Sequence, residues 1–216
     1  SHIESFNDSR IRPFQNQNNG VISVNRNFGI KKSECEFIAF CDDDDIWIDT
    51  KLEIQLNKII ETKAELVCSN LSIFEGDKNN ILIKTENRKI KNIYDLIWLN
   101  QVYTSTVIVK KSKYLLFNED INLITVEDYG LWINLLNFGY KFEFIDAELV
   151  YYRKASDGAY RNNYKRKNLK LIYLYLSVLN INKTIAYKSW VLMMIAIQTF
   201  KYIGKVAMRV VAGSKT

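Results

Sequence analysis

The chain has 216 residues, of which 48% are hydrophobic and 13% aromatic. This composition supports a packed core and excludes an intrinsically disordered or collagen-like protein. The formal net charge of +6 is unevenly distributed, because residues 158–216 contain eleven Lys and Arg but no Asp or Glu. The preceding 157 residues hold the other 19 basic residues and all 24 acidic ones, so an acidic body precedes a basic tail.

Hydrophobic periodicity predicts helices and strands in alternation along the acidic body. A strand over 11–14 and a helix over 21–30 come first, followed by a buried strand from Phe37 to Cys41. The next helix begins at Asp49 as its N-cap, and we expect it to pack through Leu52, Leu56, Ile59 and Ile60. The remaining elements expected in the body are a strand over 66–74, its hairpin partner over 81–84, a helix over 93–99, a strand over 104–109, a helix over 126–136, and strands over 142–145 and 148–153.

This alternation predicts a three-layer α/β domain with a mainly parallel central sheet, in which Phe37–Cys41 is a central strand. Three cysteines without metal-ligand spacing argue against a disulfide framework. We therefore expect Cys41 and Cys68 to be buried thiols in a reducing compartment, which favours a cytoplasmic protein. Because His2 is the only histidine and lies near the chain end, catalytic sites that need a Ser-His or Cys-His pair are excluded.

Four consecutive carboxylates, Asp42 to Asp45, follow the predicted strand Phe37–Cys41. Open α/β sheets place their ligand crevices at such carboxyl ends. Adjacent like charges repel, and a divalent cation among them would relieve the conflict. Since side chains alternate along an extended chain, Asp42 and Asp44 would point the same way. Oxygen ligands alone favour Mg²⁺ or Mn²⁺ over zinc. The alternative is a solvated acidic loop or a helix-capping cluster.

Two further features have both a structural and a functional interpretation. Glu127 and Asp128 open the predicted helix over 126–136, where they compensate the helix dipole or supply a carboxylate base beside a metal site. Gly20 precedes the helix over 21–30, where it is an ordinary loop glycine or lets the backbone approach a ligand closely.

The basic tail is predicted to form two long helices, over 169–179 and 181–211. The apolar run Ser189–Phe200 is too short to span a bilayer. Basic and apolar residues lie on different sides of the second helix, with Trp190 and Tyr202 available at an interface, so we expect it to bind an anionic membrane surface. The alternatives are packing on the same domain or on a second subunit in a homo-oligomer. Nucleic-acid binding is not expected, because no recognition motif is present.

Several motifs occur in a fixed order along the acidic body. They are Asn19-Gly20-Val21, Asn25-Arg26-Asn27-x-Gly29-Ile30, Phe37-Ile38-Ala39-Phe40-x-Asp42-x-Asp44-Asp45-x-Trp47, Lys51-Leu52-Glu53, Thr104-Ser105-Thr106, Glu127-Asp128-Tyr129-x-Leu131-Trp132 and Leu149-Val150-Tyr151-Tyr152-Arg153. Together they resemble family-2 glycosyltransferases, which have the GT-A fold and inverting chemistry. The resemblance covers about Phe6 to Arg153, without the first strand-helix-strand unit that many relatives have.

The resemblance implies a role for each matching residue. Asp44 would bind Mg²⁺ or Mn²⁺, Asp42 would join it or face the nucleotide, and Asp128 would be the catalytic base. The other substrate contacts that it implies are Gly20, Arg26, Asn27, Asp43, Thr104, Glu127 and Trp132. Many relatives also place a His after the Tyr-Arg strand, whereas this chain has Lys154-Ala155-Ser156 there.

We therefore expect a metal-dependent transfer, with inversion, of a sugar from a nucleoside-diphosphate sugar to an acceptor hydroxyl. The acceptor would be a glycan or lipid-linked sugar in bacterial surface polysaccharide synthesis. Residues 1–157 would form an N-terminally incomplete GT-A-like domain and residues 158–216 a helical tail, on a cytoplasmic protein that is peripheral on the inner face of the membrane. The alternative is a truncated, non-catalytic GT-A module for acceptor binding or membrane scaffolding.

Overall fold

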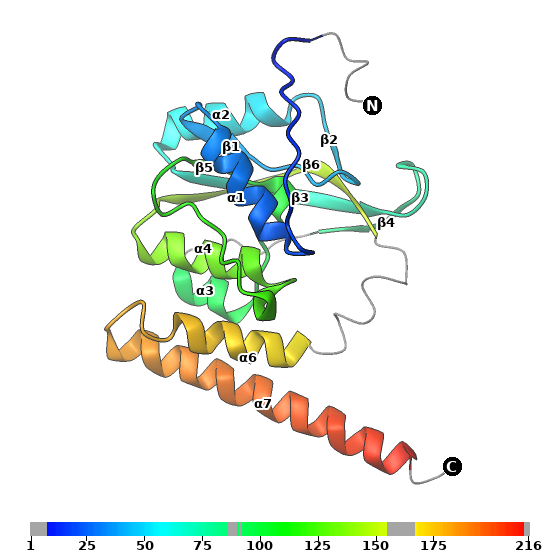
Figure 1. The fold of residues 1–216 in the computed structure, drawn as a ribbon, viewed down its shortest axis with the longest axis vertical. Coiled ribbons are helices and arrows are strands. Elements are labelled where there is room, and N and C mark those ends of the chain that lie inside the picture. Colours follow the sequence, from blue (N-terminus) through cyan, green and yellow to red (C-terminus); the bar gives the residue numbers. More distant parts are fainter. Residues whose placement is uncertain (1–7, 86–89, 91, 155–166, 214–216) are drawn as a thin grey trace.

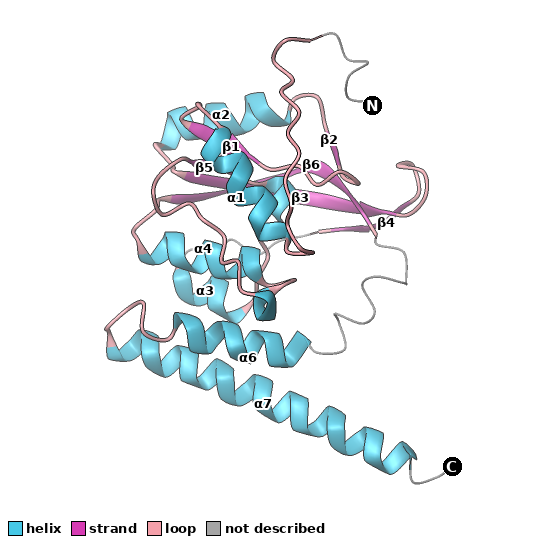
Figure 2. Ribbon diagram, viewed as in Figure 1, coloured by secondary structure: helices cyan, strands magenta, loops and turns pink. Residues whose placement is uncertain are grey.

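The computed structural model describes residues 8–85, 90, 92–154 and 167–213, and the side chains up to Met208. A six-stranded sheet crosses the centre of the molecule, with helices on both sides (Figures 1 and 2). The strands are β1 (Phe37–Ala39), β2 (Ile46–Trp47), β3 (Leu66–Phe74), β4 (Ile81–Lys84), β5 (Ile108–Lys110) and β6 (Phe142–Arg153). The helices are α1 (Ile22–Lys32), α2 (Lys51–Thr62), α3 (Ile93–Trp98), α4 (Glu127–Asn137), α6 (Lys167–Val178) and α7 (Ile185–Gly213), with short 3-10 turns η2 (Thr104–Thr106) and η3 (Ile121–Leu123).

The strand order is β1-β5-β3-β6-β2, with β4 paired to β3. Among the described strands β3 and β6 form the one parallel pair, from Leu66 opposite Phe142 to Phe74 opposite Arg153. The α/β class is confirmed, but the predicted mainly parallel pairing and the central position of β1 are wrong. Strand β5 runs antiparallel between β1 and β3. As a result β1, β3 and β6 still point the same way, and their carboxyl ends share one edge of the sheet.

The helices form layers on the two faces of the sheet (Figure 1). Helix α2 covers one face, where Ile59 packs with Val67, Ile108 and Leu149. Helices α3 and α4 cover the other face, and α6 and α7 lie outside them. Buried residues of the tail, such as Leu174 and Tyr187, belong to the same hydrophobic cluster as strand β3. The tail therefore extends the core of the acidic body.

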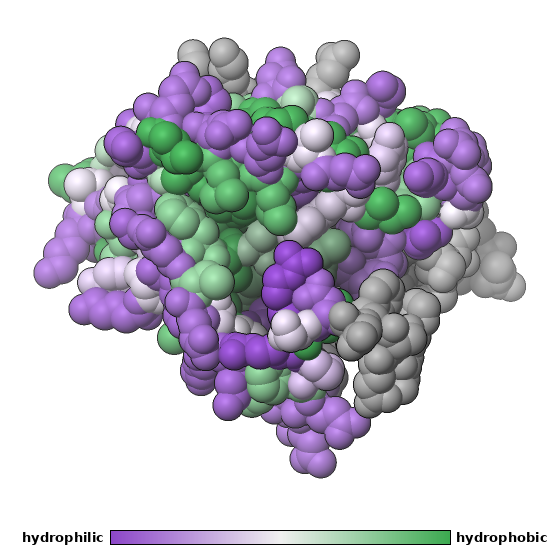
Figure 3. Space-filling model, turned by 90° about the horizontal axis from the view of Figure 1, so that it is seen from above, coloured by the Kyte–Doolittle hydropathy of each residue, from purple (hydrophilic) through white to green (hydrophobic). Residues whose placement is uncertain are grey.

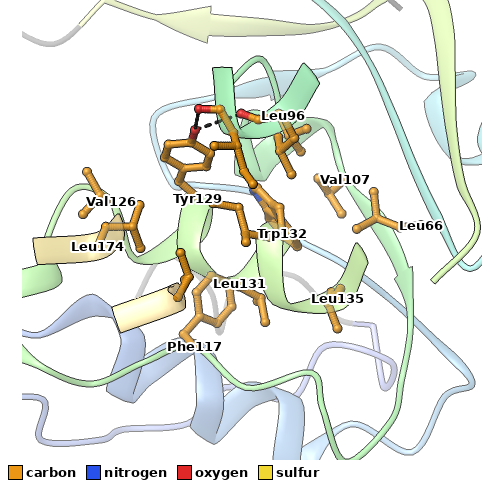
Figure 4. Close-up of a cluster of buried hydrophobic side chains, with 14 of the residues drawn as sticks. Leu66, Leu96, Val107, Phe117, Val126, Tyr129, Leu131, Trp132, Leu135 and Leu174 are labelled. Atoms are coloured by element: carbon orange, nitrogen blue, oxygen red, sulfur yellow. Dashed lines mark hydrogen bonds between the residues drawn. The ribbon is translucent and has the colours of Figure 1, made fainter. Parts of the chain in front are cut away.

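Helix α4 lies at the centre of the larger cluster (Figure 4). The ring of Trp132 is fully buried, with ring centroids 6.4 Å from Phe40 and 6.1 Å from Phe117. The hydroxyl of Tyr129 donates to the carbonyl of Leu96 or Ile97, at 2.8 and 2.7 Å, and lies 3.1 Å from the hydroxyl of Tyr175. These contacts fix α4 between α3 and α6.

Gly130 lies at one of these helix contacts. A Cβ atom at Gly130 would lie 2.9 Å from Cδ1 of Leu174, closer than two carbon atoms normally approach. The absence of a side chain at Gly130 therefore lets α6 lie close against α4.

The buried side of α2 differs from the prediction. Lys51, Gln55 and Ile59 are buried, whereas Leu52, Leu56 and Ile60 are exposed, Ile60 by 65%. The ammonium of Lys51 lies 4.1 Å from the Trp47 ring centroid and donates to Oε1 of Gln55 at 2.6 Å. Because cation–π and hydrogen-bond partners are present, this polar side can be buried. In the view from above, hydrophobic patches interrupt the hydrophilic surface (Figure 3).

Other local predictions also need correction. Residues 11–14 form no strand, and 104–109 begins as the 3-10 turn η2 before β5. Thr50, not Asp49, is the N-cap of α2, and no side chain bonds to that helix end. The two strands predicted over 142–153 are one continuous strand, β6. Cys41 is exposed, whereas Cys68 is buried as expected.

The two predicted tail helices are confirmed as α6 and α7, and the loop joining them lets α7 pack along α6 (Figure 1). Within the described residues α7 is the one helix long and apolar enough to cross a bilayer. By length and composition this holds for its 24-residue stretch Ile185–Met208, in which 18 consecutive residues have a mean hydropathy of 1.3 and are 17% buried. The apolar run Ser189–Phe200 lies within this stretch, which also contains Lys188, Lys201 and Lys205. The ring centroid of Trp190 lies 5.9 Å from that of Tyr94. Trp190 therefore packs within the protein, whereas the sequence predicted that it would be available at an interface.

Candidate functional site

Arg26 connects three parts of the chain at the carboxyl-end edge of the sheet. From α1 its guanidinium donates to Asp42 after β1 at 2.9 Å and to Glu127 at the start of α4 at 3.0 Å. The Arg26 and Glu127 side chains are 12% and 8% exposed, so their ion pair is largely shielded from water, whereas the Asp42 side chain is 31% exposed. Burial lowers the pKa of Arg26, but the charges of Asp42, Glu127 and Asp128 outweigh it and raise that pKa overall. The structure therefore brings together residues that lie about a hundred positions apart.

Asp128 lies beside this ion-pair cluster, at the first turn of α4. Its carboxylate accepts a hydrogen bond from the Thr104 hydroxyl at 3.1 Å and from the backbone amide of Tyr129 at 2.6 Å. Burial, followed by the negative charge of Glu127, raises the pKa of Asp128 to about 6, although both hydrogen bonds and Arg26 act in the opposite direction. A carboxylate with a pKa near neutrality is suited to accept and release a proton.

The four acids after β1 have different surroundings. Asp42 accepts from Arg26, and its amide donates to the Ser105 hydroxyl at 3.1 Å. Asp45 is buried and accepts the Arg153 amide at 3.0 Å, and burial raises its pKa to about 6. Asp43 and Asp44 are exposed. The loop turns here, with the Asp45 amide bonded to the Asp42 carbonyl at 3.1 Å, so simple alternation does not hold.

Arg153 and Ser105 lie within the sequence motifs but were not predicted to be site residues. The guanidinium of Arg153 donates to the Asp44 carbonyl at 3.1 Å and to the Gly76 carbonyl at 2.8 Å. The carbonyl of Ser105 accepts the indole N–H of Trp47 at 2.9 Å. Both residues fix the backbone of the acidic loop. Their positions within motifs gave a signal, but no pattern indicated their partners.

Three residues expected to contact substrate lie away from this cluster or behind it. Asn27 is buried and bonds both the amide and the carbonyl of Phe117 at 2.8 Å, so it holds that loop against α1. Trp132 is fully buried in the core, which corrects its expected place at a ligand surface. Gly20 is exposed and has a φ of +78°, a conformation that favours glycine, so a turn explains it without a ligand.

A cavity of about 470 Å³ opens beside Asp128. Its walls come from the end of α3 and the segment that follows it up to Tyr103, from the start of α4, from Tyr152 of β6, and from α6 and α7. The rings of Tyr103 and Tyr152 lie 5.5 Å apart in its lining. Among the described residues that line the cavity, Asp128 is the one acidic residue. This volume is within the range of pockets that bind small ligands.

The described residues include no group of three or more His, Cys, Asp or Glu side chains that would hold a metal ion by themselves. Mg²⁺, however, is commonly held by one or two carboxylates together with substrate phosphates. Asp44 is exposed, and one oxygen of Asp42 is bonded to Arg26. These donors fit an ion shared with a bound diphosphate, and they do not fit a closed protein site.

The sequence and the fold were compared with known proteins. Residues 1–117 match the family model described as "Glycosyl transferase family 2". The chain belongs to that family. Its fold matches the crystal structure of S. aureus TarS residues 1–349 in complex with UDP-GlcNAc, with a TM-score of 0.60 over 82% of this chain and 52% of TarS. At 16% sequence identity this likeness shows the fold, which is the GT-A type.

Two curated relatives are similar in sequence. The chain is 30% identical over 141 residues to Escherichia coli WfgD, a UDP-Glc:alpha-D-GlcNAc-diphosphoundecaprenol beta-1,3-glucosyltransferase. The matched region covers 62% of this chain and 51% of WfgD. The chain is 24% identical over 158 residues to TuaG, a putative teichuronic acid biosynthesis glycosyltransferase of Bacillus subtilis, which covers 73% of this chain and 62% of TuaG. The family-2 chain thus spans about half of WfgD and less than two thirds of TuaG.

Proposed function

We propose that this protein takes part in inverting transfer of a sugar from a nucleoside diphosphate to an acceptor hydroxyl in bacterial surface polysaccharide synthesis. The observation that carries the proposal is the position of Asp128. It lies in the wall of a cavity of about 470 Å³, has a pKa raised to about 6, and is joined through Glu127 and Arg26 to the acidic loop. A base and a donor-binding loop are the two parts that the reaction needs.

The chemistry requires one proton acceptor and no covalent nucleophile. The acceptor hydroxyl attacks the anomeric carbon of the donor, and the bond from that carbon to the diphosphate oxygen breaks. Asp128 accepts the hydroxyl proton as attack proceeds, and Thr104 holds its carboxylate in place. Attack from the face opposite the leaving diphosphate inverts the anomeric centre in a single displacement.

The donor side is formed by the acidic loop. Asp44 and Asp42 would hold Mg²⁺ or Mn²⁺, which supplies neutralising charge for the leaving diphosphate when it is bound. Asp43 is exposed beside them and available to the nucleotide. Arg26 holds Asp42 in place and forms an ion pair with Glu127 beside the base. Asn27 contributes indirectly, because it fixes Phe117, whose ring lies 5.3 Å from the Arg26 guanidinium.

The relatives suggest the substrate classes. WfgD is named for a UDP-glucose donor and a GlcNAc-diphosphoundecaprenol acceptor, and TarS was solved with UDP-GlcNAc. A UDP-sugar donor and a lipid-linked acceptor are therefore the substrates that we propose for this chain.

The tail supports a location at the inner face of the cytoplasmic membrane. Helix α7 exposes Ile185, Leu192, Phe200 and Ile203 on its outer side, and the described part of the chain does not cover them. An apolar helix side of this kind binds at a bilayer interface. Residues 158–216 would then be the membrane-facing part and residues 1–157 the glycosyltransferase part.

A second function, a non-catalytic module that binds acceptor at the membrane, is favoured by one observation. Arg26 donates a hydrogen bond to Asp42, which is one of the two carboxylates expected to bind the metal ion of the donor. The two functions differ in donor binding and turnover.

The test is a transfer assay with UDP-[¹⁴C]glucose and UDP-[¹⁴C]GlcNAc, a GlcNAc-diphosphate-lipid acceptor, and Mn²⁺ or EDTA. Metal-dependent transfer that Asp128→Asn abolishes supports the enzyme. The non-catalytic module is supported if the chain binds acceptor but neither UDP-sugar with Mn²⁺ present.

A further inference from the structure

The inward side of α7 changes character along its length. Tyr187, Val191, Met194 and Gln198 are buried against α3, α4 and α6. Their spacing of four, three and four residues continues to Lys201 and Lys205, so these lysines lie on the same side of the helix. Both contribute to the lining of the cavity beside Asp128. Lys201 and Lys205 are exposed to solvent at this cavity, and the apolar side of α7, including Ile203, points the opposite way.

A network of hydrogen bonds joins α6 and α7 at the lysines of the cavity lining. The ammonium of Lys205 donates to Oδ1 of Asn168 at 2.7 Å, and the Asn168 amide donates to Oε1 of Gln198 at 2.8 Å. Asn168 and Gln198 are 8% and 7% exposed, so this link between α6 and α7 is buried. It positions Lys205 through a neutral partner, which leaves the positive charge uncompensated.

The cavity has a charge pattern that a ligand can match. Among the described residues no carboxylate forms an ion pair with Lys201 or Lys205. Of the lining residues that the structure describes, Asp128 is the one that is acidic, and Tyr103 and Tyr152 belong to the same lining. Ammonium groups without carboxylate partners bind phosphate oxygens as point charges. A ligand with a neutral, hydroxyl-bearing part at Asp128 and an anionic part at α7 matches both ends.

We propose that Lys201 and Lys205 form the subsite for the diphosphate of a lipid-linked acceptor. This inference rests on the proposed function for the role of Asp128, but diphosphate binding can be measured without transfer. The acceptor sugar lies between the tyrosines and Asp128, and its diphosphate contacts the two lysines. The lipid leaves the cavity toward the exposed apolar residues of α7, such as Phe200 and Ile203.

The binding test uses dodecyl diphosphate and the uncharged dodecyl glucoside as probes, by calorimetry below micelle formation. The variants are Lys201→Gln and Lys205→Gln, singly and together, because Gln at 205 can still donate to Asn168. Lys183→Gln is the matched control, since Lys183 is exposed in the loop between α6 and α7 and does not line the cavity. We expect the dissociation constant of dodecyl diphosphate to rise roughly tenfold in the double variant, which is about 1.4 kcal/mol. It should change less than twofold in the control.

Two outcomes would overturn the subsite. One is unchanged diphosphate affinity in a double variant whose thermal unfolding matches that of the wild type. The other is equal loss in Lys183→Gln, which would indicate an effect of overall charge. Vesicles with and without phosphatidylglycerol separate the two sources of phosphate. If the lysine variants weaken vesicle binding but leave diphosphate binding unchanged, the lysines serve the membrane surface and the proposal is wrong.

Asp128→Asn separates this inference from the proposed function. The variant should bind dodecyl diphosphate like the wild type, because Lys201 and Lys205, not residue 128, are the proposed ligands of the diphosphate. In the transfer assay the lysine variants should raise KM for the diphosphate-linked acceptor and leave kcat within about twofold, since they do not touch the reacting hydroxyl. If no transfer occurs but the lysines still determine diphosphate affinity, the proposed reaction fails and the subsite remains.

Discussion

Replacing Asp128 by Asn should abolish transfer and at the same time stabilise the fold. Thr104 and the Tyr129 amide bond to different oxygens of the Asp128 carboxylate. The Asn side chain keeps the shape of Asp, its oxygen can accept from the Tyr129 amide, and its NH2 group can donate to the Thr104 hydroxyl. It removes the proton acceptor that the reaction needs. It also removes a charge that burial makes unfavourable.

The size of the stabilisation follows from the pKa of Asp128. Burial and the charge of Glu127 raise it from 3.8 to about 6. At 1.36 kcal/mol per pKa unit, holding the ionised form in the native state costs at most about 3 kcal/mol at neutral pH. Because Asp128 is partly exposed, we expect about 2 kcal/mol, which corresponds to a rise in Tm of roughly 4–8 °C for a chain of this size.

The effect of Asp128 on the stability of the native state should depend on pH. Below pH 3.8 the carboxyl is protonated in both the native and unfolded states, so it imposes no ionisation cost. Between pH 3.8 and about 6 the unfolded state releases its proton first, and native stability falls as the pH rises. The stability difference between Asp128→Asn and wild type should therefore be smallest near pH 4 and greatest above pH 6. Asp45 also has a pKa near 6, but it is present in both proteins and cancels in the comparison.

The assay is urea unfolding of both proteins from pH 4 to pH 8, followed by circular dichroism. Asp49→Asn serves as the matched control, because it removes a carboxylate that is exposed. An Asp128→Asn protein that is equally stable or less stable at pH 7.5, or a difference that does not change with pH, would refute the assigned environment. Retained transfer would refute the role of base.

Three further outcomes are expected. Asp44→Ala should weaken donor binding in Mn²⁺ and have little effect in EDTA, as measured by titration with UDP-glucose; equal loss in both conditions would contradict a metal-binding role. Trp132→Ala should lower the free energy of unfolding by about 3–5 kcal/mol, because it leaves a cavity between Phe40 and Phe117 that urea unfolding would detect. Ile203→Glu should reduce co-sedimentation with phosphatidylglycerol vesicles more than Lys201→Glu does, since Ile203 is on the exposed apolar side; the opposite order would place the basic side on the membrane.

The positions of most helices and strands could be predicted, but their buried sides and pairing could not. In α2 the apolar stripe was clear, yet Lys51 and Gln55 are buried, because Trp47 and Thr106 provide partners from elsewhere in the chain. No periodicity carries that information. Strand β1 was recognised from its sequence, but its place at the end of the sheet depends on β5, which is short and follows a 3-10 turn.

The parts of the site that could be predicted are those in which several acidic residues are adjacent in the sequence. The acidic run and the Glu127-Asp128 pair were recognisable because like charges side by side are unfavourable without a function. The sequence could not show that Arg26 joins these two segments or that Asp45 turns inward to bond the Arg153 amide. Whether Asp44 and Asp128 act on one substrate stays a prediction.

The close contact between α4 and α6 has a consequence for which acceptors can react. Tyr129 and Gly130 follow Asp128 directly in the sequence, and they lie against Tyr175 and Leu174 of α6. The base is thereby held at a fixed height above α7, and so above any bilayer on which α7 rests. Such an arrangement would select acceptors by the distance between the reacting hydroxyl and the lipid. A hydroxyl on the first sugar after the lipid would reach Asp128, whereas one several sugars further out would project past it. Chain length of the glycan, rather than length of the lipid, would then decide which step of polymer assembly this protein performs.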